Sequence, residues 1–232
     1  VAQYLSENTH FEIKLLVAAD GGAASGKTTA AKLLSQKYGL NFLSSGLLYR
    51  YFAYRLLLKK KLKKKIPYLK KISKNINQKK LKNKKLFNHD VTKHASLIAK
   101  SKKVRTILKK YQKNFAKQNQ VCIEGRDIGS VICPKADIKL FFKCSLNVRA
   151  KRRWDEYRKI NSKIKLSEVK KALKIRDSLD INRKYSPLRV LKDSIVIDTS
   201  KLSKKEVLGK VSKVVERKLI LKYGSKYKRR KK

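Results

Sequence analysis

Residues 20–29 read DGGAASGKTT, and the rest of the chain can be interpreted around them. Gly21, Gly26, Lys27 and Thr28 have the G-x-x-x-x-G-K-[ST] spacing of a phosphate-binding loop. The small residues let backbone N–H groups converge on one anion, Lys27 adds a positive charge, and the Thr28 hydroxyl can coordinate Mg²⁺. We therefore expect phosphate contacts from Gly21, Gly22, Ala23, Ala24, Ser25, Gly26, Lys27, Thr28 and Thr29.

The sequence on either side of this loop supports the interpretation. Residues 13–19, IKLLVAA, form a short apolar run that is typical of a buried strand. Residues 28–38 carry apolar side chains at helical spacing and are followed by Gly39, a common helix stop. A chance glycine- and alanine-rich turn is the alternative, but such a turn does not require this order of strand, loop and helix.

Length and composition bound the kind of protein. The chain has 232 residues, of which 41% are hydrophobic, enough for one α/β domain or a domain with a small insert. It has no apolar run near 18 residues, and residues 1–12 lack the long apolar region of a secretory signal, so we expect no membrane span. The three cysteines are Cys122, Cys133 and Cys144, and all lie in apolar segments. This placement favours buried thiols and a cytoplasmic location.

The net charge is unusual. There are 63 Lys and Arg residues against 16 Asp and Glu residues, a net charge of +47. Such a balance is typical of nucleic-acid or anionic-surface binding, or of a compositional bias that fills exposed positions with lysine. The lysines are spread along much of the chain without a recognised nucleic-acid module, so we expect no specific nucleic-acid partner. Non-specific, salt-sensitive binding to polyanions is expected under either interpretation.

Alternating apolar segments predict the fold class. Beyond the first strand, further strands are expected at 41–43, 120–124, 137–144 and 194–198. Helices are expected at 44–54, 90–115 with an interruption near 101–103, 146–158, 166–179 and 203–223. This alternation predicts an α/β protein of the P-loop NTPase fold, with about five parallel strands and helices on both faces of the sheet.

Two stretches are less regular. Residues 59–85 are rich in lysine, and we expect two short basic helices or a partly ordered linker there, with a break at Pro67. Ser44, Ser45 and Gly46 are expected to form a loop and helix cap. The last residues, 225–232, read SKYKRRKK and are expected to be a disordered basic tail.

Arginines follow the phosphate-binding loop with few carboxylates among them. Phosphoryl transfer depends on positioning and on neutralisation of charge, which suits such groups. The N-K-x-D motif of a GTPase is absent, and so are the coupled motifs of a motor or helicase. Among proteins with this loop, small-molecule kinases remain.

Five segments, in this order, resemble bacterial cytidylate kinases: 20–29, SGLLYR at 45–50, EGRDIG at 124–129, RDSLDINR at 176–183 with SPL at 186–188, and IVIDTSKL at 195–202. The resemblance runs from about residue 15 to residue 215. It implies transfer of the ATP γ-phosphate to CMP or dCMP, with Mg²⁺, on a nucleoside monophosphate kinase fold. It also implies a small acceptor-binding insert and a lid.

The resemblance assigns roles residue by residue. It implies that the acceptor phosphate is held by Arg50, Arg126 and Arg183, and the cytosine by Ser96, Arg105 and Asp127. The ribose is assigned to Arg176 and Asp180, proximity to the acceptor to Ser45, and the lid over ATP to Arg149, Arg152 and Arg153. Lys27, Arg126 and Arg183 are the expected catalytic residues, and Thr28 with the phosphates is the expected Mg²⁺ site.

The resemblance also divides the chain. We expect an N-terminal extension at 1–12, a kinase domain at 13–222 and a basic tail at 223–232. Within the domain, 59–89 is expected to be a reduced acceptor-side insert and about 149–183 the lid region, and the protein is expected to be a monomer.

The sequence departs from the family pattern at four positions. Gly22 replaces a usual proline, Thr28 a frequent Gly or Ser, Ser44 a frequent aspartate and Leu179 a frequent arginine. Two alternatives stay open: a kinase that prefers another monophosphate such as UMP, and a basic nucleic-acid-binding protein that retains the loop.

Overall fold

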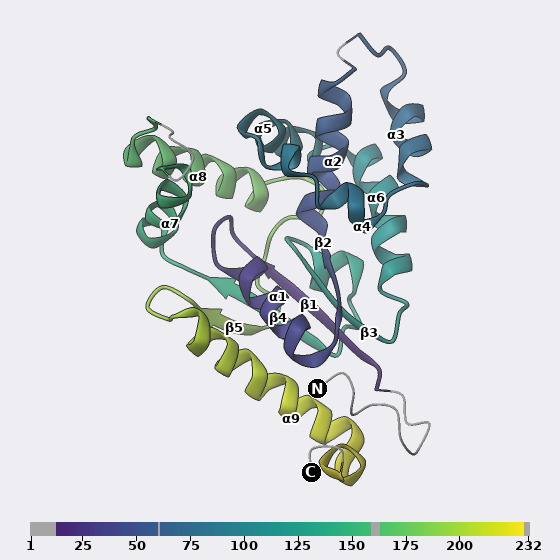
Figure 1. Cartoon of the computed structure of the whole chain (residues 1–232), viewed down its shortest axis with the longest axis vertical. Helices are drawn as coiled ribbons and strands as arrows, with labels where there is room; N and C mark the ends of the chain where they lie inside the picture. Colours follow the sequence, from purple (N-terminus) through teal and green to yellow (C-terminus); the bar gives the residue numbers. More distant parts are fainter. Residues whose placement is uncertain (1–12, 60, 159–162, 230–232) are drawn as a thin grey trace.

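The computed structural model describes residues 13–59, 61–158 and 163–229, and the expected extension at 1–12 lies outside these ranges. Five parallel strands form one sheet in the order β2-β3-β1-β4-β5 (Figure 1). The strands are β1 (Leu15–Gly21), β2 (Asn41–Ser44), β3 (Gln120–Gly125), β4 (Ile138–Lys143) and β5 (Ile195–Asp198). The predicted five-stranded parallel sheet is confirmed.

Strand β1 lies at the centre of the sheet and is buried on both faces. Leu15, Val17 and Ala19 point into one core, and Ala18 points into the other. Its apolar run therefore fits a strand that is covered on both sides, as parallel sheets require. This position places the loop that follows β1 at the middle of one sheet edge.

Two layers of helices cover the sheet (Figure 1). One face packs against α1 (Lys27–Tyr38) and α9 (Lys204–Arg229). The other face supports α2 (Ser45–Leu57), α3 (Lys65–Ser73), α5 (His89–Ile98) and α6 (Lys102–Phe115). Helices α7 (Leu146–Arg158) and α8 (Leu166–Ile181) pack on each other and form a third, smaller apolar cluster.

The lysine-rich segment is ordered where the structure describes it. It contains α3, α4 (Gln78–Leu81) and the 3₁₀ turn η2 (Lys84–Phe87), which insert Leu69, Leu81 and Leu86 into the core. The expected break at Pro67 is wrong, because Pro67 lies in the first turn of α3, where its missing N–H has no helical partner to lose.

The C-terminal segment is also more ordered than expected. Helix α9 passes through a non-helical residue, Gly224, and continues to Arg229. Tyr227 is 8% exposed and belongs to the same core as Leu219, so the expected disordered tail is wrong for residues 225–229. Residues 230–232 lie outside the described ranges. One apolar tyrosine among basic residues anchors this segment.

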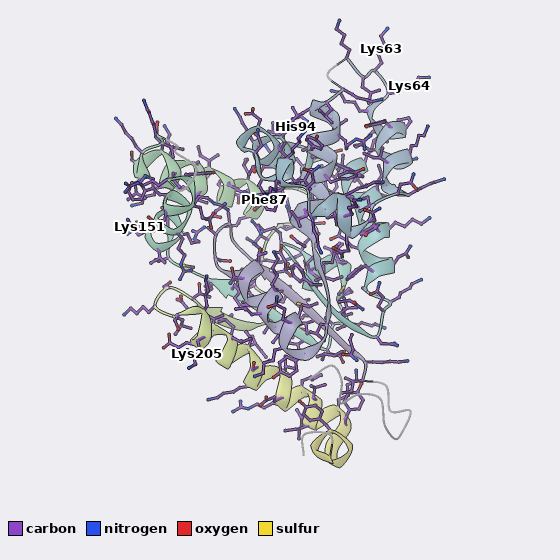
Figure 2. All side chains as sticks on the ribbon, in the orientation of Figure 1. Lys63, Lys64, Phe87, His94, Lys151 and Lys205 are labelled. Carbon is purple, nitrogen blue, oxygen red and sulfur yellow. The ribbon has the colours of Figure 1, made fainter. Side chains whose placement is uncertain are left out.

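The exposed lysines are distributed over separate elements. Figure 2 shows Lys63 and Lys64 before α3, Lys151 on α7 and Lys205 on α9, far apart on the molecule. Across the described ranges, every helix is too short or too polar to cross a bilayer.

We expect Leu219→Ala to lower the free energy of unfolding by about 2–4 kcal/mol, since it removes a side chain that is 2% exposed. Leu221→Ala is the matched control on the same helix. Its side chain is 84% exposed, and we expect a change within about 0.5 kcal/mol. Urea unfolding measures both; equal changes would contradict the packing of α9 on the sheet.

Candidate active site

A cavity of about 790 Å³ lies at the carboxyl ends of the strands. Its walls come from the loop after β1, the first turn of α2, helices α5 and α6, the turn after β3, and helices α7 and α8. Open parallel sheets bind ligands at this edge, where the strand order changes direction beside β1. Every predicted site residue lines this cavity except Gly21, Gly22 and Arg149, which lie behind its wall.

The phosphate-binding loop has the backbone that its sequence predicts. Gly26 has φ 81° and precedes Lys27, the first residue of α1, so the N-terminus of this helix faces the cavity. A Cβ atom on Gly21 would lie 2.5 Å from the carbonyl oxygen of Phe142, which only glycine avoids. Free N–H groups and the helix dipole favour an anion at this point.

Lys27 is buried beside a carboxylate that the sequence analysis did not assign. Its Nζ lies 3.7 Å from Oε2 of Glu124 and donates to the carbonyl of Gly22 at 3.2 Å. Burial and the neighbouring Arg126 lower the pKa of Lys27 to about 7, while Glu124 opposes the shift. A phosphate bound in the loop would add negative charge beside Lys27 and so favour its charged form.

Ser44 supports Glu124 rather than its own helix. The Ser44 hydroxyl donates to Oε1 of Glu124, and no capping hydrogen bond from its side chain is found among the described residues. Ser44 takes the expected N-cap position of α2, but its hydroxyl contacts the buried carboxylate at the end of the adjacent strand instead of capping the helix. Glu124 could have been found from its place at the end of a strand.

The part of the cavity that the sequence resemblance assigns to the acceptor gathers guanidinium groups around one carboxylate. Arg126 donates from Nε to Asp180 at 2.8 Å, and Nη1 of Arg183 lies 3.3 Å from the same carboxylate. Arg50 and Arg176 line the same wall. Burial and the neighbouring Arg126 lower the pKa of Arg176 to about 10. Within the described part of the chain, Nε of Arg176 is buried and has no hydrogen-bond acceptor.

A second ion pair closes the far end of this half. Arg105 donates from Nη2 to Asp127, which also lies 3.7 Å from Nη2 of Arg183. The Arg105 guanidinium stacks over the ring of Tyr49, with its carbon 5.6 Å from the ring centroid. Ser96 lies on the wall and donates to the carbonyl of Thr92 in its own helix. These groups offer a fixed pattern of donors and acceptors.

The three arginines expected in the lid occupy different positions. Arg149 donates to the carbonyl of Ala23 at 3.2 Å and to Asp177 at 2.5 Å, which places it behind the loop. Arg152 and Arg153 line the cavity, and Arg153 donates to Glu156 at 2.7 Å. The position of Arg149 favours an anchor between helices α7 and α8 and the loop over a direct contact with a ligand.

Two further residues at the cavity were assigned no role from the sequence. Thr199, after β5, donates to the carbonyl of Ser25 at 2.9 Å and accepts from Nη1 of Arg152 at 3.2 Å. Phe87 is 59% exposed at the cavity mouth, where the Arg50 guanidinium carbon lies 5.3 Å from its ring centroid (Figure 2). Both contacts join segments that are distant in the chain.

Together, the parallel sheet, the loop at a helix N-terminus and the buried guanidinium cluster define a kinase of the P-loop class. The family model described as cytidylate kinase matches residues 17–217. The chain belongs to the cytidylate kinase family.

Individual proteins give the same result. The cytidylate kinase of Thermosipho melanesiensis is 36% identical over 211 residues, which cover 87% of this chain and 97% of that protein. The cytidylate kinase of Bartonella henselae is 39% identical over 193 residues, 81% and 88% of the two chains. An uncharacterised protein from Eubacterium ventriosum has a similar fold, with a TM-score of 0.55 at 12% identity over 88% of this chain and 99% of that one.

Removal of the Thr199 hydroxyl should loosen the phosphate-binding loop. We expect Thr199→Val to lower the free energy of unfolding by about 1–2 kcal/mol, because the buried carbonyl of Ser25 loses its donor. Thr199→Ser keeps the hydroxyl and is the matched control, with a smaller loss. Urea unfolding compares the two; a loss in Thr199→Ser as large as that in Thr199→Val would contradict a larger contribution from the hydrogen bond than from the methyl group.

Proposed function

We propose that this protein transfers the γ-phosphate of ATP to CMP or dCMP, in pyrimidine nucleotide metabolism. The observation that carries the proposal is a single cavity with a phosphate-binding loop at one end and the Arg105–Asp127 pair at the other. Between them lie Arg126, Arg183 and Arg176, where two phosphate groups would meet. Holding two anions in line is most of what phosphoryl transfer needs.

The loop end is proposed to bind ATP. Backbone N–H groups of residues 21–29 would surround the β- and γ-phosphates, and Lys27 would exchange part of its contact with Glu124 for them. The described residues hold no cluster of three or more metal-binding side chains, which fits a Mg²⁺ ion bound mostly by phosphate oxygens and the hydroxyl of Thr28. When bound, Mg²⁺ supplies positive charge to the transferred group.

The arginine cluster is proposed to bind the acceptor phosphate. Arg50, Arg126 and Arg183 would contact its oxygens, and Arg176 with Asp180 would hold the ribose. Asp180 already separates two guanidinium groups, so these groups are in place before an anion arrives. A phosphate oxygen is ionised at neutral pH, and the mechanism therefore requires no general base.

The Arg105–Asp127 end is proposed to recognise cytosine. Asp127 would accept from the exocyclic amino group, while Ser96 and Arg105 would donate to the ring acceptors. Uracil presents a carbonyl oxygen in place of the amino group, and a buried carboxylate 4% exposed would repel it. Ser45, at the start of α2, would lie beside the acceptor.

The lid is proposed to comprise about residues 149–183 within a kinase domain at 13–222. Arg152 and Arg153 would approach ATP, and Arg149 would anchor the lid to the loop. The insert at 59–89 would bound the acceptor half. We propose a monomeric, cytoplasmic enzyme that needs no specific nucleic-acid partner.

The reaction is tested by ADP production from Mg·ATP with CMP, dCMP, UMP, AMP, GMP or no acceptor, at low and moderate salt. Turnover confined to CMP and dCMP is expected, and Lys27→Ala should reduce it by about two orders of magnitude or more. Turnover with another monophosphate would overturn the cytosine site. A protein without acceptor-dependent turnover that binds polyanions tightly would overturn the proposal itself.

Base selectivity should depend on Asp127. We expect Asp127→Asn to lower the ratio of kcat/KM for CMP to that for UMP by about tenfold or more, since its amide can donate to the uracil carbonyl. Asp155→Asn, on the lid helix α7, is the control for loss of one carboxylate at the cavity. Unchanged selectivity in Asp127→Asn would remove this residue from base recognition.

A further inference from the structure

Asp20 is a buried carboxylate that the proposed reaction does not use. It is the residue before Gly21 in β1, it is 7% exposed, and it lies behind the cavity wall. Its Oδ1 accepts from the N–H of Ile128 at 2.9 Å, and its Oδ2 accepts from the N–H of Gly129 at 2.8 Å. Both hydrogen bonds join the donor-loop strand to a segment more than 100 residues away in the chain.

The segment that Asp20 holds carries two of the proposed acceptor-binding residues. Arg126 and Asp127 follow β3 directly, and the short π-helical turn η3 (Ile128–Ile132) begins immediately after them. The first N–H groups of a helical turn need acceptors, and the residue at the N-cap ordinarily supplies one from its side chain. Here the N-cap residue is Asp127.

The side chain of Asp127 does not cap its own turn. Within the described part of the chain, its carboxylate accepts no capping hydrogen bond, because it instead meets Arg105 and Arg183 at the cavity. Asp20 supplies the acceptors in its place. The carboxylate of Asp127 is therefore available to a ligand because another carboxylate, from a different strand, satisfies the backbone behind it.

The chemistry of the two N–H groups requires an aspartate at position 20. Two donors need two acceptor oxygens, whereas an asparagine would turn its NH₂ group toward one of them. The charge is retained against its burial: desolvation raises the pKa of Asp20 to about 6, Asp127 adds to this shift, and Arg126 and the two N–H groups oppose it. A side chain needed only to fill space would not keep such a charge.

We infer that Asp20 is a positioning residue for the acceptor's base: it caps the turn after β3 from β1 and so keeps Asp127 directed at the cavity. Selectivity for the acceptor then depends on a residue of the donor-loop strand. This inference rests on the proposed function, because it assigns the base to Asp127.

The test compares Asp20→Asn with Asp137→Asn. Asp137 accepts from the N–H of Leu16 at 2.9 Å, near the opposite end of the same strand, and is the matched control for a lost carboxylate–backbone contact. We expect Asp20→Asn to raise the KM for CMP about tenfold and to lower the CMP-to-UMP ratio of kcat/KM by a similar factor. The KM for ATP should change less than about twofold. Asp137→Asn should keep all three values near those of the wild type.

A double variant separates positioning from a general loss of structure. If Asp20 acts through Asp127, then adding Asp20→Asn to Asp127→Asn should reduce selectivity no further. Selectivity that falls additively would overturn the inference, and so would normal selectivity in Asp20→Asn. A rise in the KM for ATP as large as that for CMP would also overturn it, because the residue would then act through the donor loop.

Amide hydrogen exchange in the wild-type protein gives a readout that requires neither activity nor a folded variant. The N–H groups of Ile128 and Gly129 should exchange slowly in the absence of nucleotide, and rapid exchange would overturn the inference. A wild-type protein that fails to discriminate CMP from UMP would instead contradict the proposed function, so the two failures are distinguishable.

Discussion

At the carboxyl edge of the sheet, buried positive charge exceeds buried negative charge. The site depends on this imbalance. Burial and like charges lower the pKa values of Lys27 and Arg176, which shows how unfavourable their charged forms are without a ligand. Carboxylates offset part of this repulsion, but they leave donors free: Nε of Arg176 lacks an acceptor within the described residues. Under the proposed function, phosphates would accept from these donors, so the same buried charges that repel one another would bind the substrates.

The chain has only 16 acidic residues, and several of them form ion pairs with the buried cations at this edge of the sheet. Glu124 neutralises Lys27, Asp180 separates Arg126 from Arg183, and Asp127 meets Arg105. The lysines that produce the net charge lie mostly on outer helix faces, as Figure 2 shows for Lys205 and Lys151. The large net charge and the precise charge balance of the site are therefore separate properties.

The sequence predicts well whatever depends on local pattern. The five strands, the loop from Gly21 to Thr28 and the position of α7 follow from apolar periodicity and spacing. It predicts poorly whatever depends on contacts between distant segments. The sequence around Arg149 does not predict its hydrogen bonds to Asp177 and to the carbonyl of Ala23. The sequence around Ser44 likewise does not predict its hydrogen bond to Glu124. The sequence predicts a disordered tail wrongly for the same reason, because Tyr227 is buried only through contacts with the core on one face of the sheet.

Arg149 and Arg153, both on α7, differ in how firmly their ion pairs hold them. Arg149 is 8% exposed, and its hydrogen bonds run to a loop carbonyl and to Asp177, so it ties α7 to both α8 and the loop. The partner of Arg153 is Glu156 at the surface, one turn away on its own helix, and an exposed pair of this kind is worth little. A phosphate could therefore take Arg153 from its partner at small cost, whereas taking Arg149 would leave the half-buried Asp177 unpaired. Under the proposed function, Arg153 would therefore turn toward the phosphates, while Arg149 would keep α7 attached to α8 and to the loop.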